Sequence, residues 1–471
     1  MSVKVNFETE NPYIEGPYAP IFDEIEAHDL KVIGEIPKDL NGVYVRNGPN
    51  PRYPTKGRHH WFDGDGMLHA VHFEDGKASY RNRYIHTDAY QRESEADDGL
   101  WYGLMEPAIH NPRDMPIKDT ANTDLIYHNG QLLALWYLAG QPYALDPRTL
   151  ETLGPETFNG KLEINVSAHA KVDHETGEAF FFDQSFTPPY LSYGVADANG
   201  DLVHAVPIEV PGPRQPHDMA ITENHAILMD LSLFADPEAL RAGRYKVSFH
   251  EDIPSRFGVI PRRGGPDEIR WFDALPCYIY HVVNAWEEGD EVILVGCRVK
   301  NPEPEGRFPG KMGRMLAFLR LDAQLYEWRF NMRTGQTKER ALCGDNTEFP
   351  TIDARRTGRK SRYAFNVHLS DDPTLFFDGI FKYDLENDTR QEHWFGEGRV
   401  GSEAPLAPRP GATEEDDGYL VSFVHDLRED RSEVVILDAS DLEAPPIGRV
   451  LLPQRVPLGF HAVWVPQEDL R

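Results

Sequence analysis

Cysteine is scarce in this chain, and it has no long hydrophobic run. The three cysteines, Cys277, Cys297 and Cys343, form no CxxC pair and are too few for a disulfide framework, so we expect a reduced, cytoplasmic protein. The longest nearly apolar stretch, 132–140, is about half of what a membrane-spanning helix needs. The first ten residues lack a basic start followed by an apolar segment, so no signal peptide is expected.

Positive charge is also in short supply. The chain has 48 Lys and Arg residues against 77 Asp and Glu residues, which gives a net charge of −29. A surface this acidic repels phosphate backbones and anionic lipid headgroups. We therefore expect no nucleic-acid partner and no strong membrane association.

The chain is rich in short apolar runs separated by turn residues. Helical periodicity is scarce, and its best candidate is the short stretch 237–243. Strand-sized runs, among them 42–46, 132–136 and 418–423, are separated by Asp-Gly, Asn-Gly and Asp-Pro pairs, which suit turns and hairpins. Many short strands at regular spacing predict an all-β sandwich, barrel or propeller. A propeller blade takes about 40–50 residues, so residues 1–471 suit one domain of seven blades.

Four of the nineteen histidines lie in or beside predicted strands, next to apolar and small residues. In a propeller the inner strands of different blades converge on one axis, so one histidine from each of several blades could meet there. For any one of them alone, a structural or surface role is the better interpretation, and spacing alone does not establish a metal site. These histidines are His169, His217, His281 and His461.

Several longer segments read as motifs that follow one another along most of the chain. They are NGVYVRNGPNP (41–51), HHWFDGDGM (59–67), HDMAITENHAILMD (217–230), HVVNAWEEGD (281–290), TEFPTID (347–353), the stretch 398–420, and GFHAVWVP (459–466). Together, from about residue 30 to 466, they resemble the carotenoid cleavage oxygenases.

The resemblance implies a seven-bladed β-propeller with a cap of loops and short helices that forms a substrate tunnel. It implies Fe(II) on the axis, held by His169, His217, His281 and His461. Such an enzyme cleaves a conjugated C=C bond of a small hydrophobic alkene with dioxygen, and the products are aldehydes or ketones. Four neutral imidazoles leave the full 2+ charge on iron, unlike the commoner set of two histidines and one carboxylate.

The resemblance also implies carboxylates behind the ligands, because metal-bound imidazoles usually donate their second N–H to such a group. Glu348 and Glu403 match two of the family's glutamates by position. The third usually lies in a segment that here reads LLALWYLAGQPY (132–143), which contains no acid. We expect Tyr137 to accept the N–H of one ligand, His217, as a weaker, neutral partner.

Two features of the sequence point to different substrates. Trp136 occupies the position of a lysine that activates the phenol in family members acting on stilbenes or isoeugenol, although Tyr102 falls near their tyrosine. An apolar wall favours an extended polyene such as an apocarotenoid. Charges break up the segment 233–249, where carotenoid-extracting members carry an apolar patch, which favours a soluble aromatic alkene. Both classes stay open, and we expect tunnel walls at Phe62, Tyr102, Trp136 and Phe308.

Two other functions are compatible with the same scaffold. One is a retinoid-type isomerohydrolase, which needs no dioxygen, and the other is a non-catalytic propeller that serves as an interaction scaffold. The missing apolar patch argues against the first, and the retention of all four histidines argues against the second.

Overall fold

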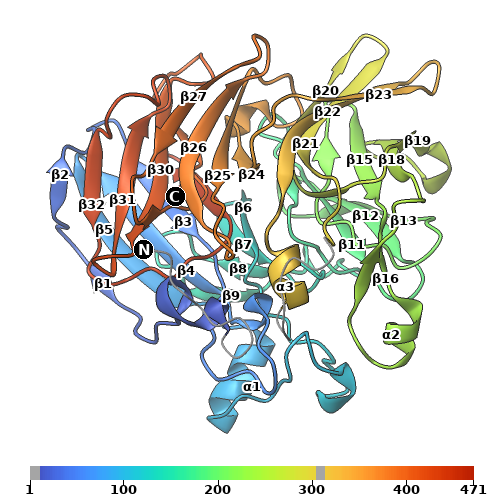
Figure 1. Ribbon diagram of the computed structural model, residues 1–471, viewed down its shortest axis with the longest axis horizontal. Coiled ribbons are helices and arrows are strands. Elements are labelled where there is room, and N and C mark those ends of the chain that lie inside the picture. The colour runs from blue at the N-terminus through green and yellow to red at the C-terminus, as the bar shows by residue number, and fades with distance from the viewer. Residues whose placement is uncertain (1–10, 304–312, 471) are drawn as a thin grey trace.

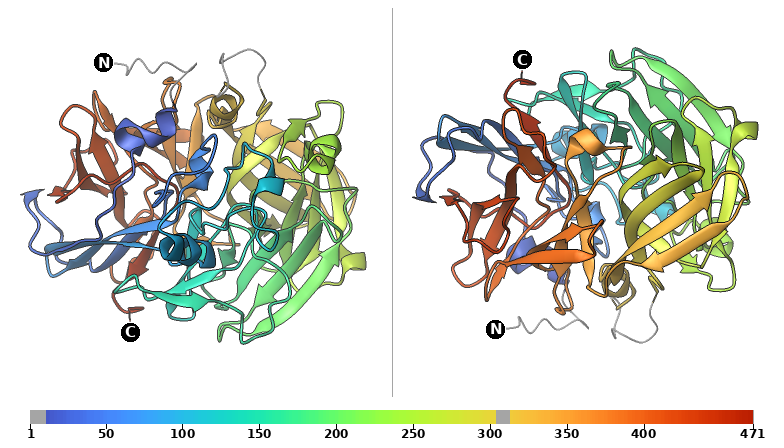
Figure 2. Two further views of the ribbon diagram at one scale, coloured as in Figure 1. Left: turned by 90° about the horizontal axis from the view of Figure 1, so that it is seen from below. Right: turned by 90° about the horizontal axis from the view of Figure 1, so that it is seen from above.

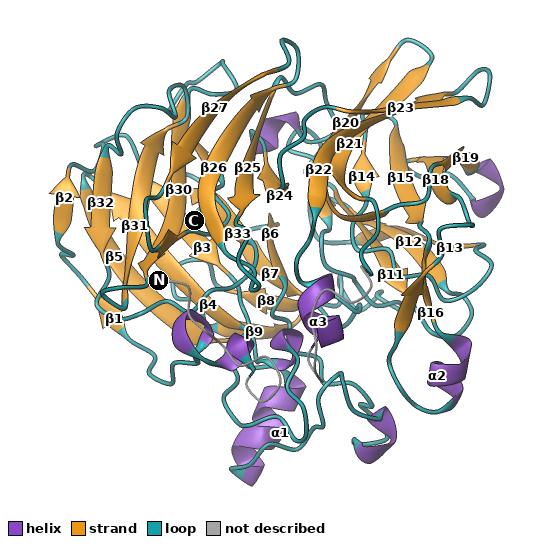
Figure 3. Ribbon diagram, in the orientation of Figure 1, coloured by secondary structure: helices purple, strands orange, loops and turns teal. Residues whose placement is uncertain are grey.

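Short antiparallel strands dominate the computed structural model, which describes residues 11–303 and 313–470 (Figures 1 and 3). Seven sheets of four or more strands are arranged around a common centre (Figure 2). The predicted all-β, seven-bladed propeller is confirmed.

Five blades consist of four antiparallel strands each. From the axis outward they are β6 (Asp124–His128), β7 (Gln131–Leu135), β8 (Tyr143–Leu145) and β9 (Thr152–Pro155); β10 (Lys171–Val172), β11 (Ala179–Gln184), β12 (Leu191–Ala196) and β13 (Leu202–Ile208); β14 (Ala220–Ile221), β15 (His225–Asp230), β18 (Ser255–Pro261) and β19 (Arg270–Ala274); β20 (Tyr278–Glu288), β21 (Glu291–Val299), β22 (Ala323–Asn331) and β23 (Thr337–Ala341); and β24 (Thr347–Thr351), β25 (Tyr363–Leu369), β26 (Phe377–Asp384) and β27 (Thr389–Trp394).

The other two blades join the two ends of the chain. One contains β33 (Ala462–Pro466), β3 (Gly42–Arg46), β4 (Met67–Glu74), β5 (Lys77–Tyr84) and β1 (Glu26–Ala27). The other contains β28 (Arg399–Val400), β29 (Leu406–Pro408), β30 (Gly418–Asp426), β31 (Arg431–Asp438), β32 (Gly448–Leu451) and β2 (Val32–Gly34). Because β33 pairs with β3 and β2 pairs with β32, the first and last segments close the ring and leave no open edge there.

The α-helices lie on one side of the propeller, in the lower part of Figure 1. Beside them a two-stranded sheet of β16 (Leu233–Ala235) and β17 (Val247–Phe249) projects from its blade. The α-helices are α1 (Asp88–Ala96), α2 (Pro237–Arg241) and α3 (Gly313–Phe318), and the 3-10 helices are η1 (Pro12–Ile14), η2 (Gly16–Tyr18), η3 (Trp61–Asp63), η4 (Ala108–His110), η5 (Pro266–Glu268) and η6 (Ala354–Arg356). Within the described ranges, none of these helices is long and apolar enough to cross a membrane.

The core fills the spaces between neighbouring blades. Phe257 on β18 packs against Trp328 and Phe330 on β22 of the next blade, with ring centroids 5.4 and 5.1 Å apart. All three side chains are fully buried, and each such burial contributes roughly 1.5–3 kcal/mol to folding. This packing between blades holds the inner strands at fixed positions around the axis.

Candidate metal centre and substrate cavity

Four buried histidines meet on the axis, each from a different blade. His281 lies within β20, and the other three come just before an inner strand: His169 before β10, His217 before β14 and His461 before β33. The ring centroid of His169 lies 4.7, 4.8 and 4.5 Å from those of His217, His281 and His461. The inner strands thus bring together the four residues that the sequence singled out.

The backbone of His169 adopts a left-handed conformation, with φ at 64°. This conformation costs a residue other than glycine roughly 1–2 kcal/mol, and such strain persists where the surrounding structure enforces it. Phe349, which follows Glu348, has the same handedness, with φ at 46°. Two strained residues therefore lie at the axis.

Three carboxylates lie behind three of the imidazoles. The Nδ1 atom of His169 is 2.9 Å from Asp124, that of His281 is 2.5 Å from Glu348, and that of His461 is 3.1 Å from Glu403. Glu348 also accepts the N–H of Phe349, and Glu403 accepts the N–H of Ala462. A carboxylate that accepts from Nδ1–H fixes the tautomer and leaves Nε2 as a lone pair. In each of these three histidines, the Nε2 lone pair therefore remains free to bind a ligand.

These nitrogen atoms fit a metal ion. One nitrogen from each of His169, His281 and His461 lies within 4.8 Å of the other two, and Nε2 of His169 is 3.0 Å from Nε2 of His217. Nε2 of His281 is buried and has no hydrogen-bond partner among the residues described. A cation would satisfy these converging lone pairs, and imidazole suits a first-row transition metal.

Burial sets the charge state of this centre. It lowers the pKa of His169 and His281 well below the ordinary value and that of His217 to about 3. Burial also lowers the pKa of His461, but the charges of Glu403 and Asp124 outweigh it and leave that pKa raised. Three of the four imidazoles are therefore held in the neutral form that binds metals.

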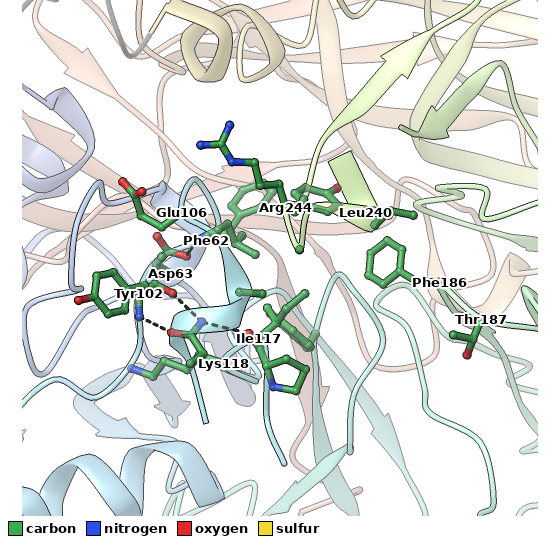
Figure 4. Close-up of a pocket in the computed structure, with 18 residues that line it drawn as sticks. Phe62, Asp63, Tyr102, Glu106, Ile117, Lys118, Phe186, Thr187, Leu240 and Arg244 are labelled. Atoms are coloured by element: carbon green, nitrogen blue, oxygen red, sulfur yellow. Dashed lines mark hydrogen bonds between the residues drawn. The ribbon is translucent and has the colours of Figure 1, made fainter. Parts of the chain in front are cut away.

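A cavity of about 600 Å³, lined by both apolar and charged side chains, lies beside the histidines, on the side where the α-helices lie. Two of its walls, Tyr137 and Tyr280, pack against His217 with ring centroids 5.8 and 5.5 Å away. A second cavity of about 320 Å³ adjoins it and shares Phe62 and Tyr245. Figure 4 shows Phe62 between Tyr102 and Phe186, which line opposite ends of this second cavity. Apolar residues that line the larger cavity include Leu104, Met105, Leu233, Val247, Met315, Phe318 and Leu319, and the charged ones are Arg58, Glu106, Asp236, Glu238, Arg244 and Lys246.

Similarity to known proteins identifies the family of this chain. The family model for RPE65, the retinal pigment epithelial membrane protein, matches residues 18–466. Carotenoid 9,10(9',10')-cleavage dioxygenase 1 of Arabidopsis thaliana is 41% identical over 495 residues, covering 98% of this chain and 90% of that protein. The chain belongs to the carotenoid cleavage oxygenase family.

Two further relatives agree with this assignment. Isoeugenol monooxygenase of Pseudomonas nitroreducens is 31% identical over 97% of this chain and 98% of its own length. The crystal structure of lignostilbene dioxygenase from Pseudomonas brassicacearum superimposes with a TM-score of 0.89 at 30% identity, covering 98% of this chain and all of that one (100%). This carotenoid cleavage oxygenase is therefore an oxidoreductase of the dioxygenase class.

The residues expected to form the tunnel walls lie at different places around the two cavities. Phe62 lines both cavities, whereas Tyr102 and Trp136 line only the smaller one. Tyr102 is 37% exposed and its ring lies 5.2 Å from that of His110, so it lies at the outer part of that cavity. Phe308 lies outside the described residues.

The expected bond between Tyr137 and His217 is wrong. The Tyr137 hydroxyl lies 2.5 Å from the hydroxyl of Tyr245 instead, because Tyr245 approaches from the segment between α2 and β17. Within residues 11–303 and 313–470, His217 is the one histidine of the four without a carboxylate partner.

Asp124 is the carboxylate that sequence reasoning missed. The third acid was expected in 132–143, but it lies earlier in the chain, at the start of β6. A signal was available, since β6 is the inner strand of a blade without a ligand histidine, and its first residue occupies the axial position. In this enzyme Asp124 supports His169 and not His217.

Asp218, which follows His217, holds that segment in another way. Its carboxylate lies 2.7 Å from the ammonium of Lys171 and accepts the N–H of Val282 at 2.8 Å. Lys171 is two residues after His169, and Val282 follows His281. One buried carboxylate therefore links three of the segments that carry histidines.

Replacing Asp218 by asparagine should lower the free energy of unfolding by about 2 kcal/mol, since hydrogen bonds to a charged group are lost. Chemical denaturation of the purified protein measures this effect. An unchanged midpoint and slope would show that the link between the three segments does not stabilise the fold.

Proposed function

We propose that this protein is a non-haem Fe(II) dioxygenase that cleaves a conjugated C=C bond of a small hydrophobic alkene into two carbonyl products. The observation that carries the proposal is the convergence of four buried imidazoles beside the larger cavity. The ligands would be His169, His217, His281 and His461. The names of the relatives point to two substrate classes, carotenoids and aromatic alkenes such as isoeugenol.

The protein's own side chains would have two roles, which are to orient the ligands and to position the substrate. Asp124, Glu348 and Glu403 hold three imidazoles in the tautomer that presents Nε2 to the axis. The apolar walls align the alkene beside the ligands and exclude water, which protects reactive oxygen species from side reactions. Fe(II) bound here would supply the activation of dioxygen. The reaction balances without a reductant, because one alkene and one O₂ give two carbonyl groups.

We also propose that residues 1–471 form a single domain that works in the cytoplasm. The pairing of β33 with β3 supports one domain, because the chain's two ends share a blade. The three cysteines are free thiols, which suits a reducing compartment.

Incubation with a β-apo-carotenal, isoeugenol, 4-vinylguaiacol and resveratrol, under air and under nitrogen, tests the proposed reaction. We expect a pair of carbonyl products from at least one substrate under air, with one atom of ¹⁸O₂ in each product. Turnover under nitrogen would indicate hydrolysis or isomerisation and would contradict the dioxygenase assignment for this chain.

A further inference from the structure

The wall of the cavity beside His217 is made of four tyrosines and a glutamine. Tyr137, Tyr245, Tyr278, Tyr280 and Gln215 all line the larger cavity. Hydrogen bonds link Tyr137, Tyr245, Tyr278 and Gln215 to one another. The cavity is also lined by charged side chains, those of Arg58, Glu106, Asp236, Glu238, Arg244 and Lys246. A polar wall in such a cavity orients a ligand through the hydrogen bonds it can still form.

Gln215 determines the direction of the hydrogen bonds in this wall. Its Nε2 donates to the carbonyl of Arg214 at 2.9 Å, so the orientation of the amide is set and Oε1 must accept. The Tyr245 hydroxyl donates to that Oε1 at 3.2 Å. Tyr245 has then used its proton, so the Tyr137 hydroxyl, 2.5 Å away, is the donor in the bond between the two tyrosines.

The hydroxyl groups of Tyr278 and Tyr280 also donate their protons to acceptors within the protein. The Tyr278 hydroxyl donates to the carbonyl of Gln215 at 2.8 Å, and the Tyr280 hydroxyl donates to the carbonyl of Phe318 at 3.2 Å. All four phenolic protons therefore point to protein acceptors. What the tyrosines still offer to the cavity is the lone pairs of their oxygens, and a hydroxyl oxygen can accept as well as donate.

We propose that this wall is a binding subsite for a neutral hydroxyl group of the substrate, which donates its proton to the oxygen of Tyr137. The inference rests on the proposed function and deepens it by naming the substrate class, a conjugated alkene that carries a free hydroxyl. Because the Tyr137 ring packs 5.8 Å from that of His217, the hydroxyl lies close to the reacting double bond, as in a hydroxyphenyl alkene.

The subsite discriminates by hydrogen-bond direction. A methyl ether or a phenolate presents lone pairs to the lone pairs of Tyr137, and a buried polar group left without a partner is costly. The subsite therefore selects a protonated hydroxyl.

Binding of 4-propenylphenol and its methyl ether tests the subsite. We expect the intact, iron-loaded protein under nitrogen to bind the phenol about 10-fold more tightly than the ether, measured by fluorescence quenching. Tyr137→Phe should reduce this ratio to about one, since the acceptor oxygen is gone. In Tyr245→Phe the proton of Tyr137 becomes free to donate, so the ether should bind more tightly than it does to the parent protein.

Tyr53→Phe is the matched control, because its hydroxyl donates to Asp97 and the residue lines neither cavity, so the preference should persist. Equal binding of both probes to the parent protein, failure of both to bind, or a preference that survives Tyr137→Phe would overturn the subsite. These outcomes are independent of catalysis, because binding is measured without dioxygen. Conversely, absence of carbonyl products under air with the phenol preference intact would contradict the proposed reaction and leave the subsite standing.

Discussion

Replacing His281 by alanine is expected to abolish both iron binding and alkene cleavage. His281 contributes a buried Nε2 that has no hydrogen-bond partner among the described residues, and Glu348 fixes its tautomer. Without this imidazole the centre loses one metal-binding nitrogen, and the space it leaves is a cavity that water can enter. We expect iron content near background and a loss of kcat/KM greater than about 100-fold, which exceeds the usual cost of losing a supporting partner. His217→Ala should behave in the same way.

Metal analysis by mass spectrometry, together with product formation under air, measures the effect. His204→Ala is a suitable control, because His204 lies on the outer strand β13 and its Nε2 bonds to the carbonyl of Gly264. The control should keep both iron and activity. Full turnover in His281→Ala, or zinc as the metal of the active protein, would show that the proposed ligand set is wrong.

Removing the charge behind an imidazole should weaken iron binding without emptying the site. Asp124→Asn, Glu348→Gln and Glu403→Gln are each expected to lower iron affinity about 10- to 100-fold, the usual cost of losing such a partner. The largest effect should be at Glu348, which is fully buried and 2.5 Å from His281. An amide oxygen still accepts a hydrogen bond, so these variants should fold.

Competition with a chelator measures the affinity, and thermal melting reports folding separately. Asp119→Asn is the matched control, since Asp119 is a carboxylate that accepts from the N–H groups of Ala121 and Gln141 and supports no imidazole. It should change the melting temperature and not the iron affinity. Equal iron affinity in the parent and in Asp124→Asn would remove Asp124 from the support of His169.

Much of the site could be predicted from motifs, and the failures have a common cause. His217, His281, His461, Glu348 and Glu403 lie in segments that resemble the family, and His169 was assigned by its position between them. The structure brings all six together. Asp124 was missed because its segment carries no motif. The partner of Tyr137 was wrong because Tyr245 is 108 residues away in the chain. Long-range pairs of single side chains leave no trace in the spacing of either segment.

The sequence by itself determined the class of the fold and the chemistry of the donor set. Frequent turn residues between short apolar runs favour antiparallel blades, because such runs can bury their faces only by stacking. Only the tertiary structure decided which carboxylate supports which imidazole, and which way the tyrosine protons point. Both depend on where the folded chain places groups that are 30 or more residues apart, as in the pair of Gln215 and Tyr245 and the pair of Asp124 and His169. Hydrogen-bond direction is a property of the closed network, since the orientation of Gln215 sets that of Tyr245 and then that of Tyr137.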